Sequence, residues 1–186
     1  MERTRHDIDQ LRVDFAREPR TCALRLAQKL SWHSMELALA NQPAESEATW
    51  TEALEVANHV LTGPGPSQLE RTELIRIGVG TARSMLYAGR IEQAHMVLDD
   101  AERHYADLAL HAHDPQTVLA LRGAILNVRA DCLEAEGMPE VALSVLSESL
   151  LELLAGSEAN PLIVKAMLRE PLATAERLIS RTSSGR

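Results

Sequence analysis

Apolar residues recur along the chain three or four positions apart, which is the spacing of one face of an α-helix. No segment alternates apolar and polar residues as a half-buried β-strand does. The clearest stripes are Leu26, Leu30 and Leu37 in one predicted helix and Val118, Leu121, Ile125, Val128 and Cys132 in another. The pattern therefore predicts an all-α fold.

Capping residues and glycines mark where these helices begin and end. Ser67 and Glu70 form a capping-box pattern, and Asp114-Pro115 and Asn160-Pro161 place a capping oxygen before a proline. Gly89 and Gly137 stand where helices are expected to stop. The predicted helices cover residues 4–17, 21–41, 46–61, 67–88, 90–109, 114–136, 139–155 and 161–181.

Connections of about two to six residues between long helices predict antiparallel neighbours. We therefore expect one domain over residues 1–181, because the length suits a single cooperative unit. Its predicted parts are an N-terminal helix in 1–20, hairpins at 21–61, 67–109 and 114–155, a capping helix at 161–181 and a disordered tail at 182–186.

A short pattern recurs after 48 residues in the second helix of two hairpins. The repeated positions are Gly89, Ala94, Leu98 and Ala101 in one copy and Gly137, Ala142, Leu146 and Ser149 in the other. A small residue near the start of a second helix lets it approach the first helix closely. A hairpin of this kind cannot bury its apolar surface alone, so stacked hairpins are expected to share a continuous core. Ala53 and Ala57 repeat the pattern more loosely in the first hairpin.

These positions resemble the signature of the tetratricopeptide repeat (TPR) family over roughly residues 21–155. The resemblance implies a right-handed α-solenoid of three TPR-like hairpins with flanking N- and C-terminal helices. The intervals of 41 residues (Ala53 to Ala94) and 48 residues (Ala94 to Ala142) exceed the standard repeat of about 34. The signature Trp, Tyr and Pro are also missing, so long-helix arrays of the kinesin-light-chain type are more similar. The alternative is an ordinary alanine-rich helix pair, which equally predicts stacked antiparallel helices.

Charge and composition narrow the classes of partner. The formal net charge of −8 is spread along the chain, and such a surface disfavours nucleic acid and anionic membranes. The N-terminus lacks the apolar core of a signal peptide, and no stretch is apolar enough to span a membrane. Cys22 and Cys132 form no CxxC pattern, which fits a reducing cytoplasm. We attribute the excess of arginine over lysine to codon bias in a GC-rich bacterium.

No catalytic constellation is present in the sequence. His111 and His113 form the only histidine cluster, but a zinc site would need further ligands. Ser31, His33 and Ser34 share a helix without a nucleophile elbow or an oxyanion loop. No phosphate-binding glycine loop occurs. We therefore expect no enzyme activity, no metal and no cofactor.

The resemblance to TPR proteins implies that the first helix of each hairpin lines a concave binding face. The candidate ligand-binding residues are Arg76 and Arg83 in one hairpin and Asn127 and Asp131 in the next. Two guanidinium groups seven residues apart share a helix face and suit a carboxylate or an acidic peptide. The plainer interpretation is a solvated helix face.

We therefore expect a non-enzymatic adaptor or regulatory module that binds a protein or peptide. One alternative is a sensor with an apolar pocket lined by Met35, Met85 or Met96. Another is a helical enzyme whose acids and histidines meet only in three dimensions. A third is a self-associating scaffold, for example a homodimer through the terminal helices.

Overall fold

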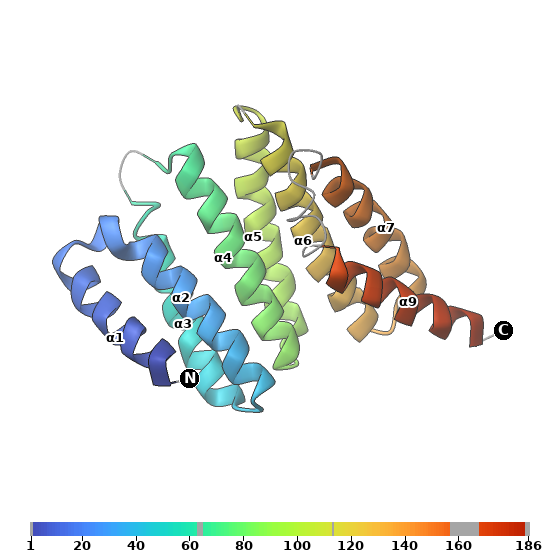
Figure 1. Cartoon of the computed structure of the whole chain (residues 1–186), viewed down its shortest axis with the longest axis horizontal. Coiled ribbons are helices and arrows are strands. Elements are labelled where there is room, and N and C mark those ends of the chain that lie inside the picture. The colour runs from blue at the N-terminus through green and yellow to red at the C-terminus, as the bar shows by residue number, and fades with distance from the viewer. Residues whose placement is uncertain (1, 63–64, 113, 157–167, 185–186) are drawn as a thin grey trace. The chain divides into compact units, whose positions relative to one another are not determined.

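The computed structural model describes residues 2–62, 65–112, 114–156 and 168–184, and over these residues the chain is all-α (Figure 1). Eight helices are present in this part of the chain, packed as sequential antiparallel pairs. They are α1 (Glu2–Arg17), α2 (Pro19–Leu39), α3 (Pro43–Asn58), α4 (Gln68–Tyr87), α5 (Ile91–Ala109), α6 (Pro115–Ala135), α7 (Pro139–Gly156) and α9 (Arg169–Ser184). The all-α prediction is confirmed, while the right-handed TPR-like solenoid stays a prediction.

The chain divides into two compact units, residues 1–104 and 105–186. In the first unit, α1 packs on α2, α2 packs on α3 and α4, and α3 also contacts α4. In the second unit, α6 packs on α7, and α9 lies against both. The predicted hairpins 21–61, 67–109 and 114–155 correspond to α2/α3, α4/α5 and α6/α7. That all helices fold as one cooperative domain stays a prediction.

The helix starts follow the capping residues that the sequence offers. Ser67 and Glu70 form the predicted capping box, and the Asp114 carboxylate accepts from the backbone N–H groups of Gln116 and Thr117. Pro43 stands in the first turn of α3, which begins three residues before the predicted start because proline presets the helical φ. The predicted start at Asn160-Pro161 lies outside the described residues.

At the C-terminal end, α9 extends to Ser184, so it enters the segment 182–186 for which we predicted disorder. The Ser180 hydroxyl donates to the Glu176 carbonyl inside this last part of the helix. Because serine can bond back to the preceding turn, a serine-rich end does not by itself stop a helix. That residues 182–186 form a disordered tail stays a prediction.

Three left-handed residues end the first helices of the three hairpins. Gly89 and Gly137 have φ of +75° and +81°, and Asn41 has φ of +58°. In each case the next residue's N–H donates to the carbonyl five positions back: Gln42 to Leu37, Arg90 to Met85 and Met138 to Leu133. Each left-handed residue also donates its own N–H to the carbonyl three positions back. The two bonds together form the Schellman motif. The equivalent residues 41, 89 and 137 are each 48 positions apart.

This spacing corrects the register that we predicted for the first hairpin. Counting from Asn41, the positions of the repeat are Ser46, Trp50 and Ala53, all of which are buried. Ala53 therefore corresponds to Ala101 and not to Ala94. The interval is 48 residues throughout, and the predicted interval of 41 is wrong.

Small residues set the separation of helices within the hairpins. A Cβ built on Gly78 would meet the Ala101 Cβ at 3.2 Å, so α4 and α5 approach closely there. In the second unit, the Ser149 hydroxyl donates to the Gly123 carbonyl at 2.7 Å. Both contacts use the last position of the repeat, which explains why only small residues occupy it.

A buried chain of hydroxyl groups joins α2, α3 and α4. The Ser46 hydroxyl donates to the Ser34 carbonyl at 2.8 Å and contacts the Ser84 hydroxyl at 3.1 Å. The Thr81 hydroxyl donates to the Ser31 hydroxyl, which in turn donates to the Ile77 carbonyl. Buried hydroxyls need such partners because an unpaired polar group in a core is unfavourable. We refer to these groups as the hydroxyl seam.

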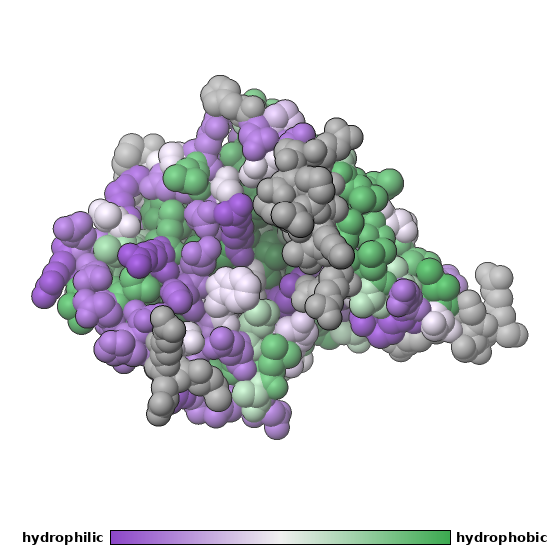
Figure 2. Space-filling model, viewed as in Figure 1, coloured by the Kyte–Doolittle hydropathy of each residue, from purple (hydrophilic) through white to green (hydrophobic). Residues whose placement is uncertain are grey.

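Each unit has its own apolar core. In the first, α1 contributes Ile8 and Leu11 to a cluster formed with α2, α3 and α4. In the second, Ala130, Ala142, Leu146 and Leu178 bring α6, α7 and α9 together. Helix α7 nevertheless carries exposed hydrophobic residues, and Figure 2 shows hydrophobic atoms on the surface over this helix. They are Val141, Leu151 and Leu154, and Met138 just before the helix is exposed as well.

Candidate functional site

The predicted residues Arg76 and Arg83 lie on the side of α4 that is not packed against the core. The Arg76 side chain is 53% exposed and pairs with Glu73 at 2.8 Å. Arg83 is half-buried. Because they are seven residues apart on one helix, they occupy the same face.

Helix α2 runs parallel to α4 and supplies the rest of this surface. Ser31 on α2 bonds the Ile77 carbonyl and Thr81 on α4, and Gln28 donates to Glu73 at 3.3 Å. Residue numbers therefore rise in the same direction on both helices. We define the α2/α4 face by Arg25, Lys29, Trp32, Glu36 and Leu39 on α2 and by Arg76, Arg83 and Tyr87 on α4.

The α2/α4 face combines cations with exposed aromatic rings. Trp32 is 61% exposed and Tyr87 is 46% exposed. The face has four cationic residues, beside Glu36 and the Glu73 that pairs with Arg76, although the chain as a whole carries −8. Lys29 also pairs with Asp7 of α1 at 3.4 Å. The sequence pattern pointed to the two arginines but not to Trp32, because exposure of an aromatic residue on a helix cannot be read from helical spacing alone.

The other two predicted residues have different surroundings. Asn127 on α6 is 3% exposed, so it is a buried residue and not part of an open groove. The Asp131 carboxylate accepts a hydrogen bond from the Thr174 hydroxyl of α9 at 3.2 Å. The structure thus does not place Asn127 and Asp131 on an open surface, and their contact with a ligand stays a prediction.

Sequence reasoning missed a two-point ion pair between α6 and α9 in the second unit. The Arg177 guanidinium of α9 donates to both oxygens of Glu134, with the shortest distance at 2.6 Å. Glu134 is 9% exposed. The spacing of Asp131 and Glu134 along α6 was visible in the sequence, but nothing in the sequence paired them with Arg177.

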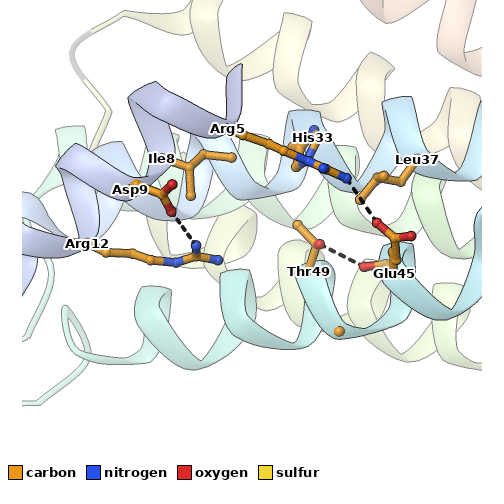
Figure 3. Close-up of a pocket in the computed structure, with 9 residues that line it drawn as sticks. Arg5, Ile8, Asp9, Arg12, His33, Leu37, Glu45 and Thr49 are labelled. Atoms are coloured by element: carbon orange, nitrogen blue, oxygen red, sulfur yellow. Dashed lines mark hydrogen bonds and ion pairs between the residues drawn. The ribbon is translucent and has the colours of Figure 1, made fainter. Parts of the chain in front are cut away.

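A cavity of about 410 Å³ lies between α1, α2 and α3 in the first unit (Figure 3). Ile8 and Leu37 give it apolar walls, and His33 also lines it. Arg5 of α1 and Glu45 of α3 pair across its opening at 3.1 Å. Its volume falls within the range of small-molecule sites, which begins at about 300 Å³.

Ion pairs fix the charged groups of this cavity. Arg12 donates to both oxygens of Glu52 at 2.7 and 2.6 Å and to Asp9 at 2.9 Å. The hydrogen bond to Glu52 raises the pKa of Arg12, against the effect of partial burial, and Asp9 raises this pKa further. The His33 Nδ1 atom lies 3.2 Å from a Glu36 oxygen. Arg12 is therefore a permanent cation held in place on α1.

The remaining residues considered for chemistry have structural contacts. Ser31 and Ser34 belong to the hydroxyl seam, so both are buried and bonded to backbone carbonyls. His111 contacts the Asp107 carbonyl, and His113 lies outside the described residues. Within the described ranges, no three His, Cys, Asp or Glu side chains are grouped so as to hold a metal ion. In the same ranges, no helix is long and apolar enough to cross a membrane.

Burial makes the thiol of Cys132 harder to deprotonate than an ordinary cysteine thiol. Its burial, with further contributions from Asp131 and Glu136, raises the pKa of Cys132 to about 11. At pH 8 its thiolate fraction is then about a hundredfold lower than that of a cysteine with the ordinary pKa.

We expect alkylation of Cys132 by iodoacetamide at pH 8 to be at least about a hundredfold slower in the folded chain than in the urea-unfolded chain. Peptide mass spectrometry gives the rate, and equal rates in the two states would contradict the buried position of this thiol.

Comparisons with protein-family models, with curated proteins and with solved structures find no match to this chain. The functional proposal below therefore depends on the residues and their geometry.

Proposed function

We propose that this chain is a non-enzymatic module that binds an acidic peptide segment of a partner protein on the α2/α4 face, within a right-handed array of TPR-like hairpins. The observation that supports this most directly is the exposure of Trp32 and Tyr87 among four cationic side chains. Protein-binding hot spots are enriched in Trp, Tyr and Arg.

The spacing of the arginines indicates the form of the ligand. Two positions seven residues apart on a helix are separated by about 10.5 Å along its axis. An extended peptide covers that distance in about three residues. We therefore expect acidic ligand residues about three positions apart, one facing Arg76 and one facing Arg83, with an apolar or aromatic ligand residue against Trp32.

Charge reversal of the two arginines is expected to weaken binding at least about tenfold, which corresponds to about 1.4 kcal/mol. The variant is Arg76→Glu/Arg83→Glu, because it replaces attraction for a carboxylate by repulsion. A partner is first identified by capture from the native cell extract, and its acidic segment is then titrated as a synthetic peptide by calorimetry.

The matched control is Arg90→Glu/Arg103→Glu, which changes the net charge equally at two exposed positions outside the α2/α4 face. This control should retain wild-type affinity at 150 mM salt. Equal losses of affinity in the two variants would show a general effect of net charge. An unchanged affinity in Arg76→Glu/Arg83→Glu would show that the two arginines do not contact the ligand.

The cavity between α1, α2 and α3 favours a second candidate function, which is the binding of a small charged molecule. Arg5 and Arg12 beside Asp9 and Glu45 suit a ligand that carries both a carboxylate and an ammonium group. The methionines named for an apolar pocket, Met35, Met85 and Met96, do not line this cavity.

Thermal unfolding with a panel of amino acids and short peptides tests this second function. A ligand present at about a hundredfold excess over its Kd stabilises the folded chain by about 2.7 kcal/mol and raises Tm by several degrees. Ala48→Leu, which adds bulk to the cavity wall, should abolish the increase. An increase that persists in Ala48→Leu would place the ligand elsewhere.

A further inference from the structure

The wall of the cavity between α1, α2 and α3 contains a nearly buried histidine. His33 of α2 is 5% exposed and lines the cavity (Figure 3). The side chains of Arg5 and Glu45, which pair across the opening, are both more than half exposed. His33 therefore lies at the inner end of the cavity, and the ion pair lies at its outer end.

A contact with Glu36 decides which nitrogen of His33 carries the hydrogen. The Nδ1 atom lies 3.2 Å from a Glu36 carboxylate oxygen. An ionised carboxylate only accepts hydrogen bonds, so Nδ1 is the donor. In a neutral ring the other nitrogen, Nε2, then has no hydrogen and acts as an acceptor. Within the described residues, the contact of Nδ1 is the only hydrogen bond of this ring.

An acceptor of this kind favours a ligand that brings a hydrogen-bond donor. Leaving a polar atom unpaired inside a protein is unfavourable, so a ligand group with an N–H or O–H is preferred at Nε2. Hydrocarbon and carboxylate groups have no hydrogen to donate. Ile8 and Leu37 line the same cavity, so the part of the ligand that passes them is expected to be apolar.

The ion pair at the opening suits the other end of the ligand. Arg5 and Glu45 meet through a single contact of 3.1 Å. An exposed pair of this kind contributes little to stability, so a ligand can replace it at little cost. An α-amino acid carries its carboxylate and its ammonium group on one carbon. Its carboxylate can therefore accept from Arg5 while its ammonium group donates to Glu45.

We propose that this cavity binds a free α-amino acid whose uncharged side chain ends in a hydrogen-bond donor, such as asparagine or glutamine, and that His33 selects it. The side-chain amide of the ligand donates to His33 Nε2, and its backbone groups replace the contact between Arg5 and Glu45. This inference rests on the second candidate function. It adds the class of the ligand and the residue that recognises the ligand's side chain.

Three amino acids of similar shape test the role of the donor. Asparagine, aspartate and leucine all have side chains that branch at Cγ, but only asparagine has a donor there. Calorimetry measures their affinities for the full chain at pH 8, at which histidine is normally neutral. We expect asparagine to bind at least about tenfold more tightly than leucine or aspartate, because only asparagine satisfies Nε2.

Two substitutions at His33 separate recognition from packing. His33→Leu removes the acceptor, so asparagine and leucine should then bind with affinities within about twofold of each other. His33→Gln keeps an acceptor oxygen at the end of its side chain, so it should retain a preference for asparagine of at least about fivefold. Circular dichroism verifies that both variants are folded.

Nitrogen NMR of the wild-type chain provides a test that needs no substitution. In a chain whose histidines are labelled with nitrogen-15, the spectra distinguish a ring nitrogen that carries a hydrogen from one that does not. We expect the hydrogen of His33 on Nδ1 at pH 8. Asparagine should shift the signal of Nε2 more than that of Nδ1.

The outcomes separate this inference from the function on which it rests. If leucine binds as tightly as asparagine and both are lost in Ala48→Leu, the cavity function stands and the role of His33 is overturned. A preference for asparagine that survives in folded His33→Leu would overturn that role too, as would a hydrogen on Nε2 in the free chain. Binding of short peptides but of no amino acid would overturn the ligand class. If neither binds, the second candidate function and this inference fail together.

Discussion

Replacing Trp50 by alanine is expected to lower the free energy of unfolding by about 3–5 kcal/mol. Trp50 is 3% exposed and stands at the bulky position of the first hairpin, where Leu98 and Leu146 stand in the other two. The cavity left by an indole ring is too large for its neighbours to fill. Because small proteins are stable by about 5–15 kcal/mol, this loss is about a fifth or more of the total. Urea unfolding followed by far-UV circular dichroism measures it.

The chain provides its own control in Trp32, the only other tryptophan. Trp32 is 61% exposed, so Trp32→Ala should change the free energy of unfolding by less than about 0.5 kcal/mol. Similar losses in the two variants would contradict the assignment of Trp50 to the core. They would also count against the 48-residue register, which aligns Trp50 with the buried Leu98 and Leu146.

Replacing Gly123 by alanine is expected to destabilise the chain by about 1–3 kcal/mol. A Cβ at this position would lie 2.5 Å from Leu153 Cγ and 3.1 Å from the Leu153 backbone nitrogen. The leucine side chain can rotate, but its backbone nitrogen moves only if α7 moves. Alanine raises helix propensity by about 1 kcal/mol over glycine, which offsets part of the loss. Thermal unfolding and urea unfolding both report the net change.

Gly78→Ala is the matched comparison within the first unit. Its new Cβ would lie 3.2 Å from the Ala101 Cβ, and its contacts with Val97 are at 3.8 Å. The gain in helix propensity then nearly offsets the tight contact, so we expect a net change within about 1 kcal/mol. If Gly123→Ala changes the free energy of unfolding as little as Gly78→Ala does, then α6 and α7 are not packed as closely at Gly123 as the structure indicates.

Local signals in the sequence predicted the helices well, because caps and C-terminal glycines act through neighbouring backbone groups. Ser67, Asp114, Gly89 and Gly137 all have the expected roles. Asn41 was missed, because asparagine adopts the left-handed conformation less often than glycine and suits many other positions. That single omission shifted the register of the first hairpin.

The sequence could place a candidate site residue only where its position on a single helix decides which way its side chain faces. Arg76 and Arg83 share a face of α4 whatever packs on its other side. The surroundings of Asp131 instead depend on α9, which is more than thirty positions away in the sequence. Long-range contacts of this kind leave no periodic signal, so helical spacing could not place this residue.

The hydroxyl seam has a consequence for recognition. Five short side chains lock α2, α3 and α4 at fixed spacing, so the backbone beneath Trp32, Arg76 and Arg83 is already ordered before any ligand arrives. A receptor with a rigid base loses little entropy on association and selects ligands by the spacing of their groups. Loosening the seam, for example by Ser46→Gly, would then lower affinity without altering a single contacting side chain.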